Sequence, residues 1–94
     1  PDKYITMLGS ITPRRFKLNN GTSDRYHVGF IAQEVEEAME VSGIDPQEFG
    51  GFIKDKDADG NDVYMLRYAE FIAILAAKIQ SLERDFVKME ERLQ

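Results

Sequence analysis

The sequence predicts a single domain of the α+β class, in which small antiparallel β-hairpins and a short helix precede a long C-terminal helix. Three observations favour this class. Turn-forming residues separate short runs of strand-forming residues, as in hairpins. One segment in the middle of the chain has apolar residues at helical spacing. The last third of the chain keeps a helical pattern without glycine or proline.

Length and composition limit what the chain can be. Its 94 residues, 43% hydrophobic and 11% aromatic, are typical of one small globular domain. A net charge of −5 argues against a nucleic-acid or anionic-membrane surface. The chain has no cysteine for a disulfide or a thiolate zinc site, and no apolar run of membrane-spanning length. We therefore expect no cofactor, no nucleic acid and no membrane contact.

The first half of the chain predicts a helix followed by a hairpin. Residues 4–8 are apolar at near-helical spacing and end at a Gly-Ser pair. Residues 11–18 predict a strand, and residues 19–24 contain Asn-Gly, the strongest hairpin signal in the chain. Residues 25–32 predict the return strand.

The second half predicts a helix and another hairpin before the long helix. The helix should begin at residue 32 or 33, with an apolar stripe formed by Ile31, Val35, Ala38 and Met39. Gly43 is placed to close it in a left-handed cap. Residues 45–48, Asp-Pro-Gln-Glu, predict a one-turn helix. Residues 52–53 and 63–68 predict two strands around an acidic loop.

The long helix, residues 68–94, repeats an apolar residue at alternating steps of three and four. This is the a/d spacing of a heptad repeat, the pattern that pairs helices in coiled coils. The seam consists of Ile72, Leu75, Ile79, Leu82, Phe86, Met89 and Leu93. A second apolar face in the first half comprises Phe71, Ala73, Ile74, Ala76 and Ala77. We expect that half to pack on its own domain and the rest to project and pair with copies of itself; a helix packed wholly on its own domain is the alternative.

The seam leaves the number of paired helices open. The first heptads have isoleucine at a and leucine at d, which favours two strands, but the later ones do not. Lys78 at g and Glu83 at the following e are placed to pair between helices. Asp85 and Glu90, one heptad later, would repel each other. The expected division of residues 1–94 is an α+β body over 1–71 and a coiled-coil helix over 72–94.

The acidic loop resembles half of a calcium site. Asp55, Asp57, Asp59 and Gly60 occupy positions 1, 3, 5 and 6 of an EF-hand loop. The twelfth position, which should be a bidentate glutamate, is Leu66, and the flanks predict strands. We therefore expect a polar hairpin tip and no metal site, with weak cation binding through the three aspartates as an alternative function.

Few residues suit catalysis. His27 is the single histidine, and no serine lies in a nucleophile-elbow motif. The basic cluster Arg14, Arg15 and Lys17 is interpreted as a solvated strand edge. An enzyme acting on outside substrates is therefore disfavoured.

The segment 27–38, His-Val-Gly-Phe-Ile-Ala-Gln-Glu-Val-Glu-Glu-Ala, resembles a family signature, G-F-I-A-Q-E-V. That signature is typical of the C-terminal intramolecular chaperone (peptidase S74) domains of phage tail spikes, tail fibres and endosialidases. Residues 11–17 resemble the strand that precedes the signature. Residues 64–73 and 79–82 resemble the start and the I-Q-x-L end of the family's closing helix.

The resemblance implies a homotrimer whose closing helices form a trimeric coiled coil. It implies that the domain assists folding of an upstream β-rich fibre stalk of the same polypeptide, in a phage tail precursor assembled in the bacterial host cytoplasm. The family releases the domain by autoproteolysis through a serine–lysine dyad in an S-D-x-x-L-K type segment. No such segment precedes Pro13, so no activity is expected from this chain.

Within the signature, His27 and Gln33 are the candidates for supporting the cleavage geometry of an intact parent, and Gly29 and Ala32 for close backbone packing. A different reading of the long helix also stays open. It is an interaction module that binds a heterologous partner, and it predicts a monomer in isolation.

Overall fold

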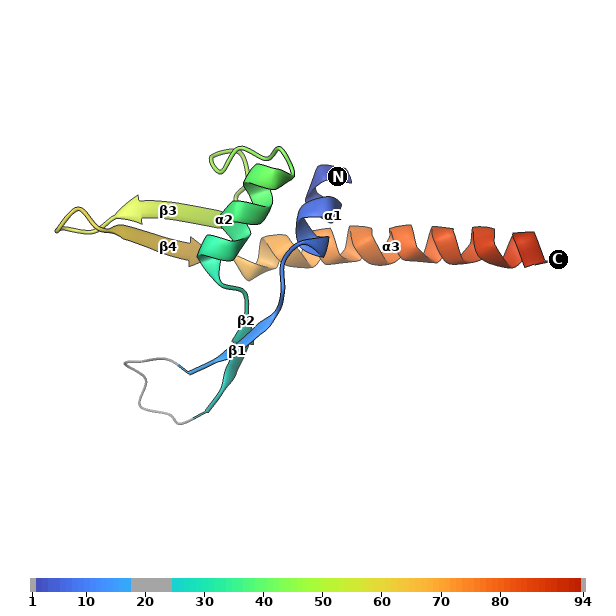
Figure 1. The fold of residues 1–94 in the computed structure, drawn as a ribbon, viewed down its shortest axis with the longest axis horizontal. Helices are drawn as coiled ribbons and strands as arrows, with labels where there is room; N and C mark the ends of the chain where they lie inside the picture. Colours follow the sequence, from blue (N-terminus) through green and yellow to red (C-terminus); the bar gives the residue numbers. More distant parts are fainter. Residues whose placement is uncertain (1, 18–24, 94) are drawn as a thin grey trace.

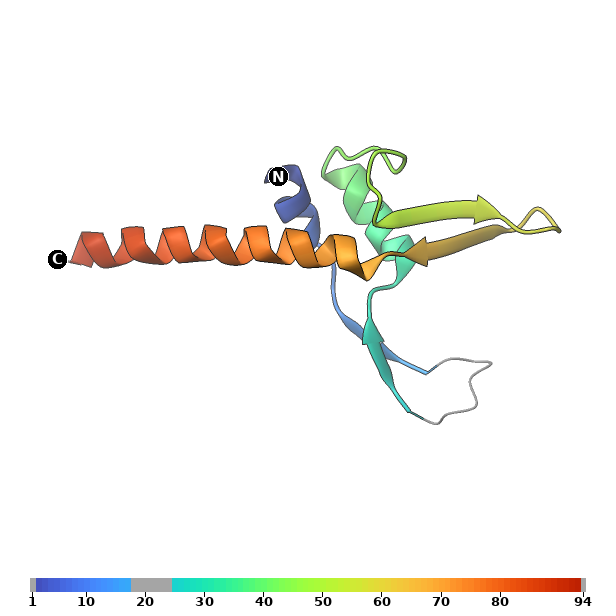
Figure 2. The same ribbon diagram turned by 180° about the vertical axis from the view of Figure 1, so that it is seen from behind.

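The protein is an elongated α+β molecule, described here by a computed structural model over residues 2–17 and 25–93. Its elements in chain order are α1 (Asp2–Gly9), β1 (Arg14–Phe16), β2 (His27–Gly29), α2 (Ala32–Val41), β3 (Phe52–Lys56), β4 (Asp62–Leu66) and α3 (Tyr68–Leu93). We call the part formed by α1, β1–β4 and α2 the head. The long helix α3 points to one end of the molecule, and the β3–β4 hairpin of the head points to the other end (Figures 1 and 2). The predicted α+β class is confirmed.

Two separate two-stranded antiparallel sheets form the β-structure of the described residues. In the first, Arg15 pairs with Val28, and in the second, Lys54 pairs with Tyr64. The first hairpin leaves the head on the side of α3 opposite to α1 and α2 (Figure 1). Its strands are shorter than predicted, three residues each. The Asn-Gly turn predicted to join them lies outside the described residues.

Helix α2 follows the predicted stripe. Val35, Ala38 and Met39 are buried, which places one face of the helix in the core. Gly43 has φ +76°, and two hydrogen bonds close the end. The Gly43 N–H donates to the Glu40 carbonyl at 3.2 Å, and the Ile44 N–H donates to the Met39 carbonyl at 2.9 Å. This is a Schellman cap, so the predicted left-handed closure is confirmed.

The predicted one-turn helix at residues 45–48 is wrong, because the structure has a hydrogen-bonded turn there. The expected capping contacts do form. The Asp45 carboxylate accepts the Gln47 N–H at 2.9 Å, and the Glu48 carboxylate accepts the Asp45 N–H at 3.1 Å. The helix does not propagate because Phe49 turns into the core directly afterwards.

The core is built around Phe71, which is 1% exposed. Its ring lies 5.4 Å from the rings of Phe30 and Phe49, in tilted and edge-to-face geometry. The buried residues are Met7, Ile11, Val35, Ala38, Met39, Ile44, Phe49, Phe52, Phe71 and Ile74. Burying each large side chain contributes about 1.5–3 kcal/mol, so α3 is held to the head chiefly by Phe71 and Ile74.

The glycine of the signature is required by a close contact. A Cβ added to Gly29 would lie 2.5 Å from the Tyr68 hydroxyl oxygen. That hydroxyl accepts the N–H of Phe30 at 3.1 Å. The prediction that Gly29 serves close packing is therefore confirmed, and the contact fixes the start of α3 against the junction of β2 and α2.

Candidate assembly surface

Helix α3 presents an uncovered apolar seam along its length. The exposed fractions of the seven seam residues are 65% for Ile72, 43% for Leu75, 55% for Ile79, 53% for Leu82, 62% for Phe86, 59% for Met89 and 83% for Leu93. In the same helix Phe71 and Ile74 are buried. Large apolar side chains in one contiguous row on a water-exposed surface indicate an interaction site.

The seam and the head lie on different sides of α3. At about 100° per residue, Phe71 lies roughly 50° and Ile74 roughly 110° around the helix from the middle of the seam. The head therefore leaves the seam uncovered even at the level where it packs on α3. Beyond Ser81, which is half-buried, every described residue of α3 is exposed. We call residues 68–81 the near half of α3 and residues 82–93 the far half.

Sequence reasoning missed one member of the seam. Tyr68 lies seven residues before Leu75 and so occupies a further d position. It is 46% exposed although its hydroxyl is held by Phe30. The heptad count, continued backwards by one step, would have found it. Tyr68 thus belongs both to the contact with the head and to the apolar seam.

Charged residues flank the seam where the heptad predicts them. Lys78 at g is half-buried, and Glu83 at e is exposed. Asp85 and Glu90, at g and e of the far half, are exposed too. A charge at e or g selects how neighbouring helices align. In a parallel arrangement Lys78 would attract Glu83 of the next helix, and Asp85 would repel Glu90 of the next helix.

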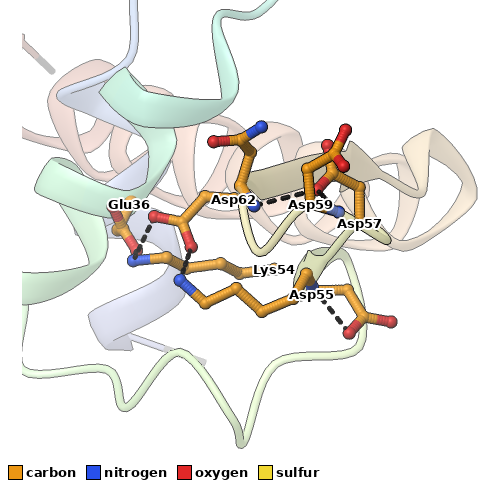
Figure 3. A network of polar contacts seen from close by, with 8 residues as sticks. Glu36, Lys54, Asp55, Asp57, Asp59 and Asp62 are labelled. Carbon is orange, nitrogen blue, oxygen red and sulfur yellow. Dashed lines mark hydrogen bonds and ion pairs between the residues drawn. The ribbon is translucent and has the colours of Figure 1, made fainter.

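The structure does not gather the predicted cation ligands. The side chain of Asp55 points away from those of Asp57 and Asp59 (Figure 3). The Asp57 carboxylate accepts the N–H groups of Asp59 and Asn61 at 2.9 and 2.8 Å. Within the described residues no group of three His, Cys, Asp or Glu side chains is arranged to hold a metal ion. The loop joins β3 and β4 at the tip of the second hairpin.

Ion pairs tie the second hairpin to α2. Lys54 Nζ lies 3.2 Å from Glu36 Oε2 and 3.9 Å from Asp62 Oδ2, and Lys56 Nζ lies 2.5 Å from Asp62 Oδ1 (Figure 3). The hydrogen bond from Lys56 lowers the pKa of Asp62, and the hydrogen bond to Glu36 raises the pKa of Lys54. The acidic composition of this region is therefore partly neutralised within the chain.

The basic cluster at the end of the first hairpin strand is exposed, as expected for a solvated edge, and its members also have partners. Arg14 donates to both carboxylate oxygens of Glu34, at 3.1 and 2.8 Å. This charge-assisted pair lowers the pKa of Glu34 and raises that of Arg14. The Arg15 guanidinium and the Lys17 ammonium lie 4.1 and 4.8 Å from the Tyr26 ring centroid. The partners come from residues more distant in the sequence than a strand pattern can indicate.

The two candidates for supporting cleavage lie at the start of β2 and in the first turn of α2. His27 is exposed, and its ring stacks on Phe16 with a centroid distance of 6.0 Å. Gln33 is exposed in the first turn of α2. Ser10, the one serine before Pro13, donates its hydroxyl to the Thr6 carbonyl at 3.2 Å. A catalytic role for His27 and Gln33 stays a prediction.

Among the helices of the described chain, none combines the length and the apolar character needed to cross a bilayer.

Comparisons with known proteins agree on one family. Residues 2–44 match the peptidase S74 family, described as the chaperone of endosialidase. "Depolymerase 1, capsule K3-specific" of Klebsiella phage KP32 is 35% identical over 71 residues. That alignment covers 70% of this chain but 8% of the phage protein, so the chain corresponds to a small part of it.

A solved structure described as a novel intramolecular chaperone has the same fold. It superposes with a TM-score of 0.67 at 23% sequence identity, and the match covers 89% of each chain. The resemblance recognised in the sequence is therefore confirmed, and the chain is a relative of the intramolecular chaperone domains of the peptidase S74 family.

Proposed function

We propose that this chain is a homotrimerising chaperone domain that assists the folding of a phage tail fibre or tail spike of which it is a part. The observation that carries the proposal is the exposed seam of α3, in particular its far half. Within the described residues the far half is exposed throughout, so the head does not cover its four large apolar side chains in register, Leu82, Phe86, Met89 and Leu93. Identical seams on neighbouring chains would bury them.

The proposed division of labour follows the two halves of α3. The head and the buried side chains of the near half hold one end of the helix, and the far half makes the contact between copies. A free helix of about three heptads is marginally stable in water. Anchoring by Phe71 therefore supports helical structure in the far half before any partner binds. We propose the same division as in the sequence, residues 1–71 and 72–94, with the anchoring contacts continuing past residue 71 to Ile74.

The trimer and the upstream stalk rest on the family resemblance. A β-rich trimeric stalk has many contacts between distant residues, which makes its folding slow. Joining three C-terminal domains first makes the later association of the stalk segments effectively intramolecular. In this proposal the chain acts within a phage tail precursor, assembled in the host cytoplasm. In a parallel bundle the Lys78–Glu83 pair would favour association, whereas the Asp85–Glu90 pair would oppose it.

Autoproteolytic release belongs to the parent protein in this proposal. The residues before Pro13 lack the S-D-x-x-L-K type segment, and the Ser10 hydroxyl donates a hydrogen bond to the Thr6 carbonyl of α1. We therefore propose that this chain assembles without cutting itself. In a longer parent that carries the dyad, release would leave the stalk kinetically trapped.

The proposal is tested by the mass of the isolated chain in sedimentation over a range of concentrations. A trimer is expected, and Leu82→Asp combined with Phe86→Asp should yield monomers, because two charges would enter the buried seam. A sharper pair is Phe86→Asp against Val87→Asp. The two sites are adjacent and similarly exposed, 62% and 52%, but Val87 lies outside the seam.

Trimer formation by Val87→Asp together with its loss in Phe86→Asp supports the seam. An unchanged trimer in the double variant refutes it. A wild-type monomer at every concentration would favour a module that binds a heterologous partner. Calorimetry with calcium tests the cation-binding alternative, for which micromolar binding that Asp57→Asn abolishes would be required.

A further inference from the structure

The head is attached to one flank of the seam, and this asymmetry has a consequence for assembly. Phe71 occupies a g position and Ile74 a c position, and both are buried in the core of the head, while Lys78 at the next g position is half-buried. Tyr68, at d, also contacts it. The head therefore lies beside the g and d edge of the seam, and α1 packs along this part of α3 (Figure 1).

The opposite flank of the near half is uncovered and apolar. Ile72, at a, is 65% exposed. Beside it lie the exposed residues Ala69 and Ala76 at e, and Ala73 at b. One heptad on, the equivalent e position is Glu83 and the b position is Gln80. The apolar flank thus ends at the level where the head stops covering the other flank, near Ser81.

In a parallel closed assembly, the g edge of each helix faces the e edge of the next. We propose, on the basis of the trimer proposed above, that the head of each copy docks on the flank of the neighbouring α3 formed by Ala69, Ile72, Ala73 and Ala76. The occupant is a second copy of this chain. Each head would then contact two helices, its own through Phe71 and its neighbour's through this flank.

Three physical arguments support a second copy as the occupant. The apolar flank continues the seam without a gap, so the same association buries both. The apolar flank ends at the same level of α3 as the head does. If only helices met in the assembly, nothing would require the flank to become polar at that level. Alanine allows the head to approach closely.

The test compares arginine at two exposed positions on the same flank of α3 in the whole chain, Ala76 at e and Val87 at b. Ala76→Arg places a long charged side chain on the flank within reach of the neighbouring head. Val87→Arg places it on the same flank of the far half, beyond the head. We expect the concentration for half-assembly in sedimentation to rise at least roughly ten-fold for Ala76→Arg and to change less than about two-fold for Val87→Arg.

If helices alone made the contact, an arginine at an e position would be tolerated, as charges there commonly are. Unchanged assembly of Ala76→Arg would therefore overturn the docking proposal while leaving the seam intact. Urea unfolding of the dilute variant shows whether its own fold is preserved; both sites are exposed in the single chain.

A second readout does not depend on disruption. The chain has no cysteine, so Ala76→Cys and Val87→Cys each introduce one thiol. Alkylation of Ala76→Cys should be slowed at least roughly ten-fold in the assembly and recover on dilution, whereas Val87→Cys should react alike in both states. Equal reactivity at both sites would contradict the docking. A wild-type chain that is monomeric at all concentrations would instead remove the proposed trimer, and the docking with it.

Discussion

The two halves of α3 have similar sequence patterns but different surroundings. In the near half, Phe71 and Ile74 are buried against the head while Ile72 and Leu75 remain in water. In the far half every described side chain is exposed, yet the heptad continues unchanged through Phe86 and beyond. One helix therefore has an apolar face that its own chain buries and a second apolar face that its own chain leaves exposed.

The difference indicates two separate interactions of α3. Its buried residues anchor the helix to the head, and its exposed heptad residues are candidates for contacts between copies. Anchoring requires a wide apolar stripe, and the near half has it at c and g in addition to a and d. Pairing with an identical helix requires only the narrow a/d stripe. The change from wide to narrow stripe, near Ser81, marks where folding contacts give way to candidate assembly contacts.

The largest expected effect separates two phenylalanines of the same helix. Phe71→Ala should lower the free energy of unfolding by about 3–5 kcal/mol, because it empties the centre of the core. Phe86→Ala should change the unfolding of the dilute chain by less than about 0.5 kcal/mol, since that side chain is exposed there. Urea titrations at low concentration measure both values. A similar loss for both variants would mean that the far half folds back on the head in solution.

The contact that fixes the start of α3 should show a compensating pair. Gly29→Ala should destabilise the chain by about 1–3 kcal/mol, because the new methyl group would overlap the Tyr68 hydroxyl. Tyr68→Phe alone should cost about 0.5–1.5 kcal/mol through loss of the hydrogen bond from Phe30. The double variant should be more stable than the sum of the two losses predicts, by chemical denaturation. Strict additivity would show that the hydroxyl does not limit residue 29.

A charge change in the far half should strengthen assembly. Glu90→Lys would turn the repulsion with Asp85 of the next helix into attraction, worth about 0.2–1 kcal/mol per pair in a parallel bundle. Glu91→Lys makes the same charge change at an outward f position and serves as the control. Sedimentation at low and high salt should show the gain for Glu90→Lys and its loss on screening. Equal behaviour of the two variants would argue against the parallel register.

The smallest expected effect is the loss of head ion pairs in acid. Hydrogen bonds from Arg14, Lys3 and Lys56 lower the pKa values of Glu34, Glu48 and Asp62 in the folded chain. A lowered folded-state pKa means that the unfolded chain takes up protons first. Stability should therefore be full above about pH 4–4.5, where unfolded carboxyls titrate, and decline as pH falls through the lower folded values.

Unfolding curves at successive pH values measure this decline. Glu34→Gln should flatten it, while Glu37→Gln, at an exposed site of the same helix outside these ion pairs, should not. An identical acid slope in both variants would show that the Arg14–Glu34 pair makes no difference between the folded and unfolded states.

Sequence patterns predicted α2, the second hairpin, α3 and the Gly43 cap because each depends on neighbours within a few positions. The same reasoning made the first hairpin too long. Gly29, the last residue of β2, lies against Tyr68, and that tertiary contact lies next to the place where the strand ends. Sequence patterns also predicted a one-turn helix at residues 45–48, which does not form because Phe49 enters the core directly afterwards. The partners of Arg14 and Lys54 lie 20 and 18 positions away, beyond the reach of a local pattern.

By itself the sequence determined that a helix closes the chain and that an apolar seam runs along it, because helical periodicity is set by consecutive residues. Only the tertiary structure decided which side of that helix the head covers. That side depends on contacts such as the one from Phe30 to Tyr68, which joins residues 38 positions apart. Their placement leaves the seam open and assigns its two flanks different surroundings.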